Sequence, residues 1–311
     1  MTCPVRAHPG HRSPSSLCKA KRCLRCYFFS RVMGLERDSV PRMLGARMGS
    51  ALHAAAPFTH AKARNPDQAF HAFDSVWLDG DDYADKKRTR KVGNRIIGEM
   101  TRVHGLECVY EPLTPVELGL SLPGNGLNEA EFTVDLGLTS GKPMMGIVDS
   151  IVRVKSTGEL GVVDYKSSTS IWSSTFGAMF ALSPQVYLYV MSLRVMGLDI
   201  RTAFIEGILV AATKCEITLV PLEIIEDVAD AMLEWVKDVD EAVMMCEQAP
   251  NSLTDPYAWP QNFAGCNPYP CFGTSGFECE FDPLCSAGRN WEELLSLYVV
   301  KPPREKKEKR V

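Results

Sequence analysis

Two acidic residues and one lysine lie on two neighbouring segments that are otherwise aliphatic. Asp149 is in the segment GIVDSIV, and Asp164 and Lys166 are in the segment GVVDYK. The turn sequence KSTG at 155–158 predicts a hairpin that makes these two segments adjacent strands. Because side chains alternate along a strand, Asp164 and Lys166 share one face, and Asp149 shares a face with Ile147 and Ile151. The pattern therefore predicts that the three charged groups gather at one place.

Such a set of groups is suited to phosphodiester hydrolysis. Two carboxylates on adjacent strands make a hard oxygen site that suits Mg²⁺ or Mn²⁺. A lysine beside the metal can orient or help to deprotonate an attacking water, or offset the charge that develops on a phosphate. The alternative is that both acids end their strands facing water, with Lys166 as a salt-bridge partner.

Three further residues have types and positions that fit the same site. Gln185 and Tyr189 are four residues apart in a predicted helix and so project from the same face. Both side chains can hydrogen-bond a phosphate or a carboxylate, although an exposed helix face would give the same spacing. His53 lies in a predicted helix among Ala and Leu, where a histidine is either a ligand or a satisfied part of the core.

The order of these motifs resembles a known family. Gly-x-x-x-His, Gly-Ile-Val-Asp, Val-Asp-Tyr-Lys-Ser and Gln-x-x-x-Tyr follow one another as in the RecB-type branch of the PD-(D/E)XK nucleases, which includes CRISPR adaptation exonucleases and many phage exonucleases. The likeness covers about residues 13–290, and within it residues 56–140 carry no recognisable motif. The resemblance implies a restriction-endonuclease-like α/β core with a mixed central sheet flanked by helices.

The resemblance also implies a role for each residue of the site. Lys166 would be the catalytic lysine, and Gln185 and Tyr189 would position the site and the DNA. The ligands of the Mg²⁺ or Mn²⁺ ion would be the side chains of His53, Asp149 and Asp164 and the backbone carbonyl of Tyr165.

The cysteines form a second feature that could carry chemistry. The chain has 11 of them, and an odd number in a reducing compartment argues against a disulfide framework. Most lie near the two ends of the chain, at positions 3, 18, 23 and 26 and at positions 266, 271, 279 and 285. Spaced thiolates in a loop rich in Pro and Gly suit Zn²⁺ or an iron–sulfur cluster.

One N-terminal cysteine with three C-terminal ones resembles the 4Fe-4S arrangement of the same nuclease branch. The ligands that this resemblance implies are Cys23, Cys271, Cys279 and Cys285. The sequence departs from the family in the spacing between its second and third cysteines, and Cys26 and Cys266 compete for the same roles. Zinc-bound or unligated cysteines are the alternatives.

Composition sets broad limits on the function. The chain has 311 residues, 45% of them hydrophobic, and a formal net charge of −4, which argues weakly against a general polyanion binder. Its basic segments, residues 86–91 and the tail KPPREKKEKRV, are more simply explained as solvated surface. No run is long and apolar enough to cross a bilayer, and the N-terminus lacks the apolar run of a signal peptide. We therefore expect a protein without membrane contact in the cytoplasm of a bacterial or phage-infected cell.

The predicted elements give an α/β fold with a helical N-terminal part and a cysteine-rich C-terminal extension. We expect a disordered N-terminus at 1–14, a nuclease domain at 15–248, a Cys-rich extension at 249–299 and a charged disordered tail at 300–311. Strands are predicted at 107–111, 132–138, 144–154, 158–165, 202–211 and 216–221. Helices are predicted at 18–32, 41–55, 184–196, 225–245 and 290–299, with a further helix within 66–105.

The function expected from these observations is a Mg²⁺- or Mn²⁺-dependent deoxyribonuclease. The resemblance favours an exonuclease that acts on single strands or duplex ends in recombination, repair or phage DNA processing, with a helicase or recombinase as partner. The main alternative is a non-catalytic DNA-binding or recombination accessory protein that keeps the fold and the cluster. A third interpretation is a zinc-binding structural protein whose acidic strands arise by chance.

Overall fold

The computed structural model divides the chain into two compact units. It describes residues 8–37, 40–60, 64–78, 81, 85–106, 108–114, 117–119, 129–169, 176–261 and 279–300. The first unit comprises Met1–Asp38, Gly137–Pro143 and Glu234–Val311, and the second comprises Ser39–Leu136 and Met144–Leu233. These units are not the domains predicted from the sequence, whose boundaries stay predictions.

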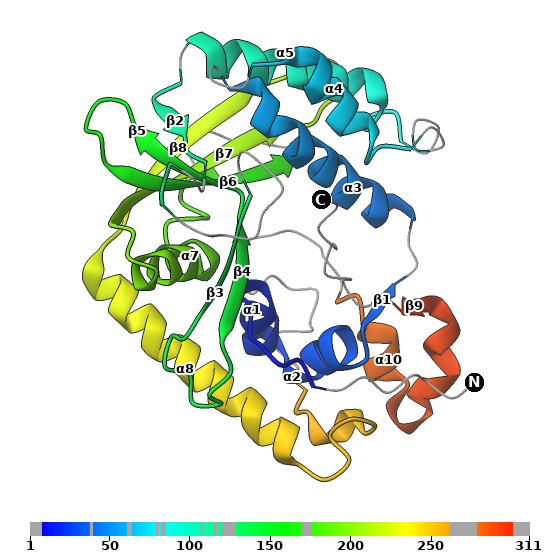
Figure 1. Ribbon diagram of the computed structural model, residues 1–311. Coiled ribbons are helices and arrows are strands. Elements are labelled where there is room, and N and C mark those ends of the chain that lie inside the picture. Colours follow the sequence, from blue (N-terminus) through cyan, green and yellow to red (C-terminus); the bar gives the residue numbers. More distant parts are fainter. Residues whose placement is uncertain are drawn as a thin grey trace, which may run out of the picture. The chain divides into compact units, whose positions relative to one another are not determined.

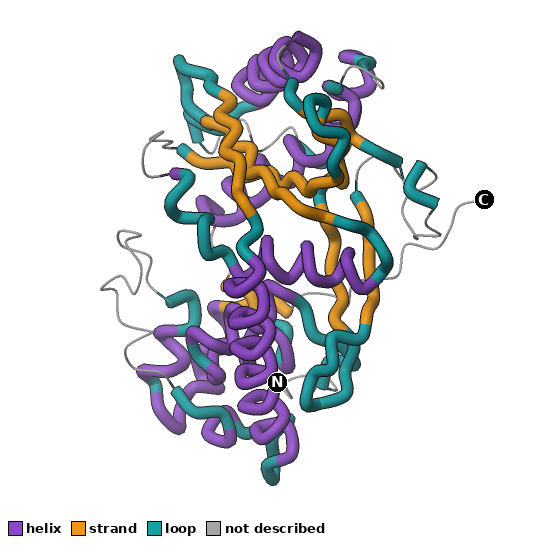
Figure 2. The backbone as a smooth tube through the Cα atoms, turned by 90° about the vertical axis from the view of Figure 1, so that its left-hand side faces the viewer, coloured by secondary structure: helices purple, strands orange, loops and turns teal. Residues whose placement is uncertain are grey.

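A five-stranded mixed sheet forms the centre of the second unit, with strand order β2-β5-β6-β7-β8. Its strands are β2 (Tyr110–Pro112), β5 (Ser150–Val154), β6 (Leu160–Ser168), β7 (Ile200–Leu209) and β8 (Ile217–Glu223). The long strands β6 and β7 are parallel neighbours, and the other pairs are antiparallel (Figures 1 and 2). Parallel neighbours need a crossover connection, and α7 (Pro184–Val195) supplies it.

Helices cover both faces of this sheet. One face carries α3 and α5, with α4 packed against them, and the other carries α7 (Figure 1). The bounds of these helices and of the adjoining 3-10 turn are α3 (Val40–Ala55), η2 (Ala56–Thr59), α4 (Pro66–Asp74) and α5 (Arg90–Leu106). The predicted α/β fold with a mixed sheet flanked by helices is confirmed, and the region 66–105 holds two helices where the sequence predicted one.

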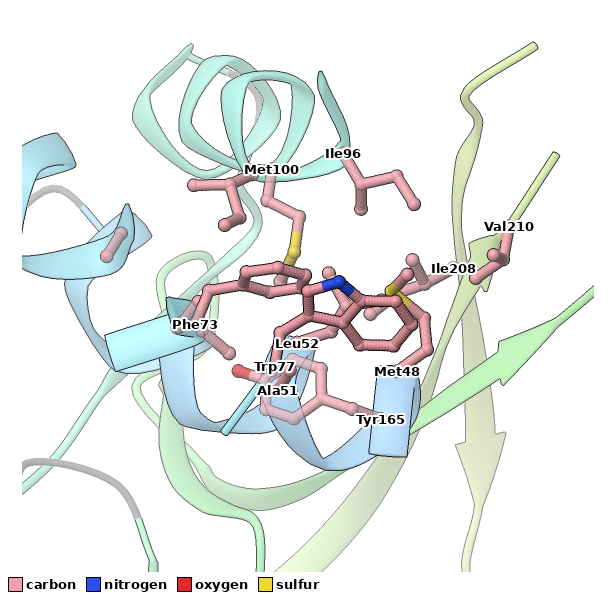
Figure 3. Packing of buried hydrophobic residues seen from close by; sticks show 14 of the residues in the cluster. Met48, Ala51, Leu52, Phe73, Trp77, Ile96, Met100, Tyr165, Ile208 and Val210 are labelled. Carbon is pink, nitrogen blue, oxygen red and sulfur yellow. The ribbon is translucent and has the colours of Figure 1, made fainter. Parts of the chain in front are cut away.

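The hydrophobic core of the second unit lies between the sheet and the helices α3, α4 and α5. Trp77 and Phe73 stack there with their ring centroids 6.0 Å apart, surrounded by aliphatic and methionine side chains (Figure 3). Ile96, Ile97 and Met100 are fully buried on α5. They belong to the apolar stripe that the periodicity of this segment predicts.

The strand predicted at 144–154 is wrong in one respect, because the chain bends at Asp149. Residues before the bend form β4 (Met144–Val148), which pairs with β3 (Ala130–Val134) in a separate two-stranded sheet. Residues after the bend form β5 and pair with β6 in the hairpin that the sequence predicted. Because each half has its own partner, the alternation of Asp149 with Ile147 and Ile151 does not hold: Ile147 is 36% exposed, whereas Ile151 is buried.

The first unit consists mainly of helices, and many of its buried side chains are aromatic. Its elements are α1 (Pro14–Arg22), α2 (Leu24–Tyr27), the π-helical turn η1 (Phe28–Val32), β1 (Leu35–Arg37), η5 (Pro256–Ala258), α10 (Asp282–Ser286), η6 (Gly288–Leu297) and β9 (Tyr298–Val300). The helix α8 (Glu226–Gln248) begins in the second unit and ends in the first. None of the helices in the described ranges combines the length and the apolarity that a bilayer crossing needs.

The N-terminal helix begins earlier and ends sooner than the sequence predicted. Ser13 is its N-cap, and a capping box joins Ser13 to Ser16. The helix ends at Cys23, which has extended backbone angles, so that 14–32 is divided into three short helical pieces.

Residues 8–14, expected to be disordered, have defined positions. Arg12 is fully buried and its guanidinium donates to Asp240 at 2.6 Å and to Glu247 at 2.8 and 2.9 Å. Asp240 also accepts from Ser140, and Glu247 from Lys142. The composition of this segment could not reveal these partners, because they lie more than a hundred residues away in the sequence.

Candidate active site

Asp164, Lys166 and Gln185 form the centre of the predicted site in the second unit. The alternation along β6 places Asp164 and Lys166 on the face that α7 covers. Lys166 Nζ lies 2.6 Å from Asp164 Oδ2 and 3.4 Å from Gln185 Oε1. The Gln185 amide nitrogen donates to Tyr189 OH at 2.7 Å and lies 3.4 Å from Asp164 Oδ1. The amide therefore lies against both the acid and the lysine.

The start of helix α7 positions Gln185 for these contacts, and the residues at that start determine where the helix begins. Ser183 is the N-cap and Pro184 is the first helical residue, in agreement with the helix predicted at 184–196. Gly197, which follows the helix, has a φ of 91°, a value that glycine adopts without strain. Gln185 is thus in the first turn, where its side chain reaches Asp164 and Lys166 on β6.

Asp149 and His53 form the second part of the site. Asp149 Oδ2 accepts the backbone N–H of Tyr165 at 2.9 Å, which ties the bend after β4 to the middle of β6. His53, on α3, places its Nδ1 3.4 Å from Asp149 Oδ1, and its ring meets the Tyr165 ring edge-on. The four predicted residues His53, Asp149, Asp164 and Lys166 therefore come together through contacts among α3, β6 and the bend.

Burial and the charges of neighbouring groups shift the pKa values of Asp164 and His53. Burial raises the pKa of Asp164, Asp149 raises it further, and Lys166 and His53 only partly oppose them. Burial is the largest influence on His53 and lowers its pKa, but the hydrogen bond to Asp149 and the charges of Asp149 and Asp164 together outweigh it, and the net pKa is raised. Asp164 is only 3% exposed, so it does not face water as the alternative interpretation required.

These donors suit a hard divalent cation in their chemistry. Carboxylate oxygens and a backbone carbonyl are ligands that Mg²⁺ and Mn²⁺ prefer, and the imidazole nitrogen is a softer donor that suits Mn²⁺ better than Mg²⁺. A buried carboxylate whose pKa is raised is costly to ionise, and a divalent cation would offset that cost. Within the described ranges, no group of three or more His, Cys, Asp or Glu side chains has the spacing of a formed metal site. The acids instead contact cationic or ionisable side chains: Lys166 contacts Asp164, and His53 contacts Asp149.

Sequence reasoning missed a set of buried polar residues on the opposite face of β6. Its members are Thr59, His60, His104, Tyr110 and Glu206, each at most 2% exposed. One signal was available: Glu206 stands alone in the apolar segment AFIEGILV, as Asp149 and Asp164 do in theirs.

Four of the described cysteines of the first unit, Cys23, Cys26, Cys279 and Cys285, lie near one another. Cys26 Sγ lies 3.2 Å from Cys279 Sγ. Burial, together with the neighbouring Cys23 and Cys279 thiols, raises the pKa of Cys285 to about 12. Cys271, a predicted ligand, and its competitor Cys266 lie outside the described residues.

An α/β sheet that brings two acids and a lysine together beside a Gln-x-x-x-Tyr helix defines a nuclease-type site. The model of the PD-(D/E)XK nuclease superfamily matches residues 11–286, and the chain belongs to this superfamily. Its members are generally nucleases and typically use Mg²⁺ or Mn²⁺.

Solved structures give a distant likeness. Sixteen chains match, among them the one titled "Crystal structure of SSO0001", with 11% identity and a TM-score of 0.27, over 68% of this chain and 89% of that one. No curated protein matches.

Proposed function

We propose that the chain is a Mg²⁺- or Mn²⁺-dependent deoxyribonuclease of the RecB-type branch, an exonuclease that acts on single strands or duplex ends. The observation that carries the proposal is the contact of Lys166 and Gln185 with the buried Asp164, next to Asp149. The biological setting that goes with it is recombination, repair or phage DNA processing in the cytoplasm, with a helicase or recombinase as partner.

Each residue of the site has a defined task in this proposal. His53, Asp149, Asp164 and the Tyr165 carbonyl would hold the metal, which supplies charge neutralisation at the scissile phosphate and a more acidic water. Lys166, on a flexible stem, orients the attacking water or offsets charge on the phosphate. Gln185 orients the Lys166 ammonium through its amide oxygen, and Tyr189 fixes the Gln185 amide through its hydroxyl.

A cleavage assay with labelled single- and double-stranded DNA tests this function. We expect wild-type cleavage with Mg²⁺ or Mn²⁺ and none with a chelator. Lys166→Ala and Asp164→Ala should each lower kcat by about 10²–10³-fold, the usual cost of removing a group that stabilises developing charge. Lys155→Ala is the matched control, because Lys155 is an exposed lysine in the turn of the same hairpin.

Linear and circular DNA substrates distinguish an exonuclease from an endonuclease. A circular single strand that stays intact while a linear strand is degraded supports an exonuclease, whereas a nicked circle contradicts it. If the wild-type protein binds DNA but cleaves neither form with any divalent ion, the non-catalytic accessory protein is the correct interpretation.

The gathered thiols of the first unit support a proposal for a 4Fe-4S cluster, with Zn²⁺ as the competing metal. The favoured ligands remain Cys23, Cys271, Cys279 and Cys285, and the contact of Cys26 with Cys279 keeps Cys26 a candidate. Analysis of iron, acid-labile sulfide and zinc in anaerobically purified protein distinguishes the two metals. Cys285→Ala should remove the metal, whereas Cys108→Ala, in the second unit, should keep it.

A further inference from the structure

Tyr165 connects the candidate site to the core behind it. It lies between Asp164 and Lys166 on β6, so its side chain points to the opposite face of the strand. Its backbone N–H donates to Asp149, and its ring is 2% exposed within the core formed with α3 and α5 (Figure 3). A shift of the Tyr165 ring that carries its Cα along would therefore also move the backbone segment that joins the two acids.

A chain of buried polar contacts holds the Tyr165 side chain. Its hydroxyl lies 3.1 Å from His60 Nε2, and His60 stacks on His104 with ring centroids 3.8 Å apart and an interplanar angle of 9°. His104 Nε2 lies 2.9 and 3.0 Å from the two Glu206 carboxylate oxygens. Tyr110 OH donates to Glu206 at 2.6 Å. Glu206 is also the direct partner of Tyr165 in the parallel β6–β7 register.

The direction of the hydrogen bonds at Thr59 can be assigned by counting protons. Thr59 Oγ1 donates to the Ala56 carbonyl at 2.7 Å, so it accepts from His104 Nδ1 at 2.6 Å. His104 then has its Nδ1 proton committed to Thr59, and the short Nε2–Glu206 contact needs a further proton on one of its two atoms. The imidazole is held at both nitrogens, and Glu206 is held by Tyr110 and by His104.

The energetic consequence is that this network resists rearrangement. Its members are almost completely shielded from water, and leaving any of them unpaired would cost the desolvation of a buried polar group. A fully satisfied network of this kind orients the groups attached to it, as hydrogen bonds behind metal ligands do. Tyr165 links this network to β6, the strand that carries Asp164 and Lys166. The other residues come from other elements: Glu206 is on β7, His104 on α5 and Tyr110 on β2.

We propose that His60, His104, Tyr110 and Glu206 are positioning residues for the nuclease site and act through Tyr165. They fix the position and the rotation of β6 in the sheet. In this way they also fix the Tyr165 carbonyl, the Tyr165 N–H that holds Asp149, and the directions of Asp164 and Lys166. This inference rests on the proposed function and adds to it a set of residues that never contact the metal or the DNA.

Mn²⁺ binding, measured by electron paramagnetic resonance, tests the inference without requiring cleavage. Tyr165→Phe removes one hydroxyl and keeps the ring, and Glu206→Gln keeps the shape of the side chain while it changes one acceptor into a donor. We expect both variants to bind Mn²⁺ about 10–100-fold more weakly, the usual effect of losing a hydrogen bond behind a ligand. For DNA cleavage we expect a lower kcat with an unchanged KM for DNA.

A purely structural role predicts a different result. Ile96→Ala makes a cavity in the same core and removes no polar group of the network, and it is the control matched for loss of thermal stability. The inference requires that Ile96→Ala lower Tm but leave Mn²⁺ affinity and kcat unchanged. If Tyr165→Phe and Glu206→Gln behave like Ile96→Ala, the network only stabilises the fold and the inference is overturned.

A failure of the proposed nuclease function would give a different set of results from a failure of this inference. A wild-type protein that binds Mn²⁺ but cleaves no DNA contradicts the nuclease proposal, and the Mn²⁺ affinities of the variants still decide the role of the network. A wild-type protein that binds no Mn²⁺ overturns both.

Discussion

At the scale of single residues, the Gln185–Tyr189 pair gives a sensitive probe of the site. Tyr189 is 7% exposed, accepts from the Gln185 amide and packs edge-on against Phe132. Tyr189→Phe keeps the packing and removes the acceptor, so Gln185 loses one constraint on its orientation toward Lys166. A neutral hydrogen bond contributes about 0.5–1.5 kcal/mol, so we expect kcat for DNA cleavage to fall about 2- to 10-fold.

The same substitution at a tyrosine outside the site provides the comparison. Tyr187, two residues earlier on α7, is also buried, and Tyr187→Phe should leave kcat within twofold of wild type at a comparable Tm. Equal losses in both variants would show that Tyr189 affects the helix and not the orientation of Gln185.

The residues of the site were predictable to the extent that they are local in sequence. Asp164, Lys166, Gln185 and Tyr189 follow from a strand period and a helix period, and the structure brings them together. His53 was placed near the acids only through the resemblance to a family. The roles of all these residues in catalysis stay predictions, while the network around Glu206 was missed because its partners come from four separate elements.

At the scale of elements, the close approach of β3 and β4 supports the helix that carries Gln185. Gly146 is the register partner of Phe132, and a Cβ added to Gly146 would lie 2.4 Å from the tip of the Phe132 ring. Phe132 is 1% exposed and packs against Tyr189, so its ring has little room to move. We expect Gly146→Ala to destabilise the second unit by about 1–3 kcal/mol, the usual cost of overpacking a core.

Urea denaturation measures this change, and a second glycine gives the control. Gly98 is exposed within α5, and an added Cβ there meets no atom within 4 Å. Gly98→Ala should therefore stabilise the unit by up to about 1 kcal/mol, because alanine is the better helix former. If Gly146→Ala leaves the free energy of unfolding unchanged, the Phe132 ring can rotate away from the added methyl group without cost.

Elements with local start and stop signals were predicted well, and elements defined by distant partners were not. The start of α7 at Pro184 and the β5–β6 turn at 155–158 follow from residues within each segment. The bend at Asp149 does not, because the aliphatic run continues through it and only the separate pairing of β4 and β5 divides it. The change of partner strand also explains why Asp149 contacts Tyr165 N–H instead of continuing the strand alternation.

At the scale of the whole molecule, the first unit is assembled from three stretches of chain that are remote in sequence. Arg12 joins the N-terminal stretch to α8 through Asp240 and Glu247, and its backbone N–H donates to Pro143 in the short middle stretch. Lys142 in that middle stretch also contacts Glu247. No local pattern encodes such an arrangement, which explains why the sequence indicated disorder for residues that are held by buried ion pairs.

These ion pairs make the stability of the first unit depend on pH. Burial alone would raise the pKa of Glu247, but hydrogen bonds from Arg12 and Lys142 outweigh burial and lower it. A carboxyl whose folded pKa lies below its unfolded value, about 4.3, stabilises the fold above that value. The stabilisation is lost as pH falls through the folded pKa. We therefore expect Glu247→Gln to cost about 1–3 kcal/mol near neutral pH, since it weakens the pairing of a buried guanidinium.

The pH profile distinguishes this cause from a general loss of packing. In urea denaturation, the wild-type and Glu247→Gln stabilities should converge as pH falls from the unfolded pKa through the lower folded pKa of Glu247, where the wild-type carboxyl also becomes neutral. Glu241→Gln, exposed on the same helix, should follow the wild-type curve throughout. Parallel curves for wild type and Glu247→Gln down to acid pH would show that the charge of Glu247 does not hold Arg12 in place. The three stretches of the first unit would then be held together by their other contacts, among them the Arg12–Asp240 ion pair and the hydrogen bond from Arg12 N–H to Pro143.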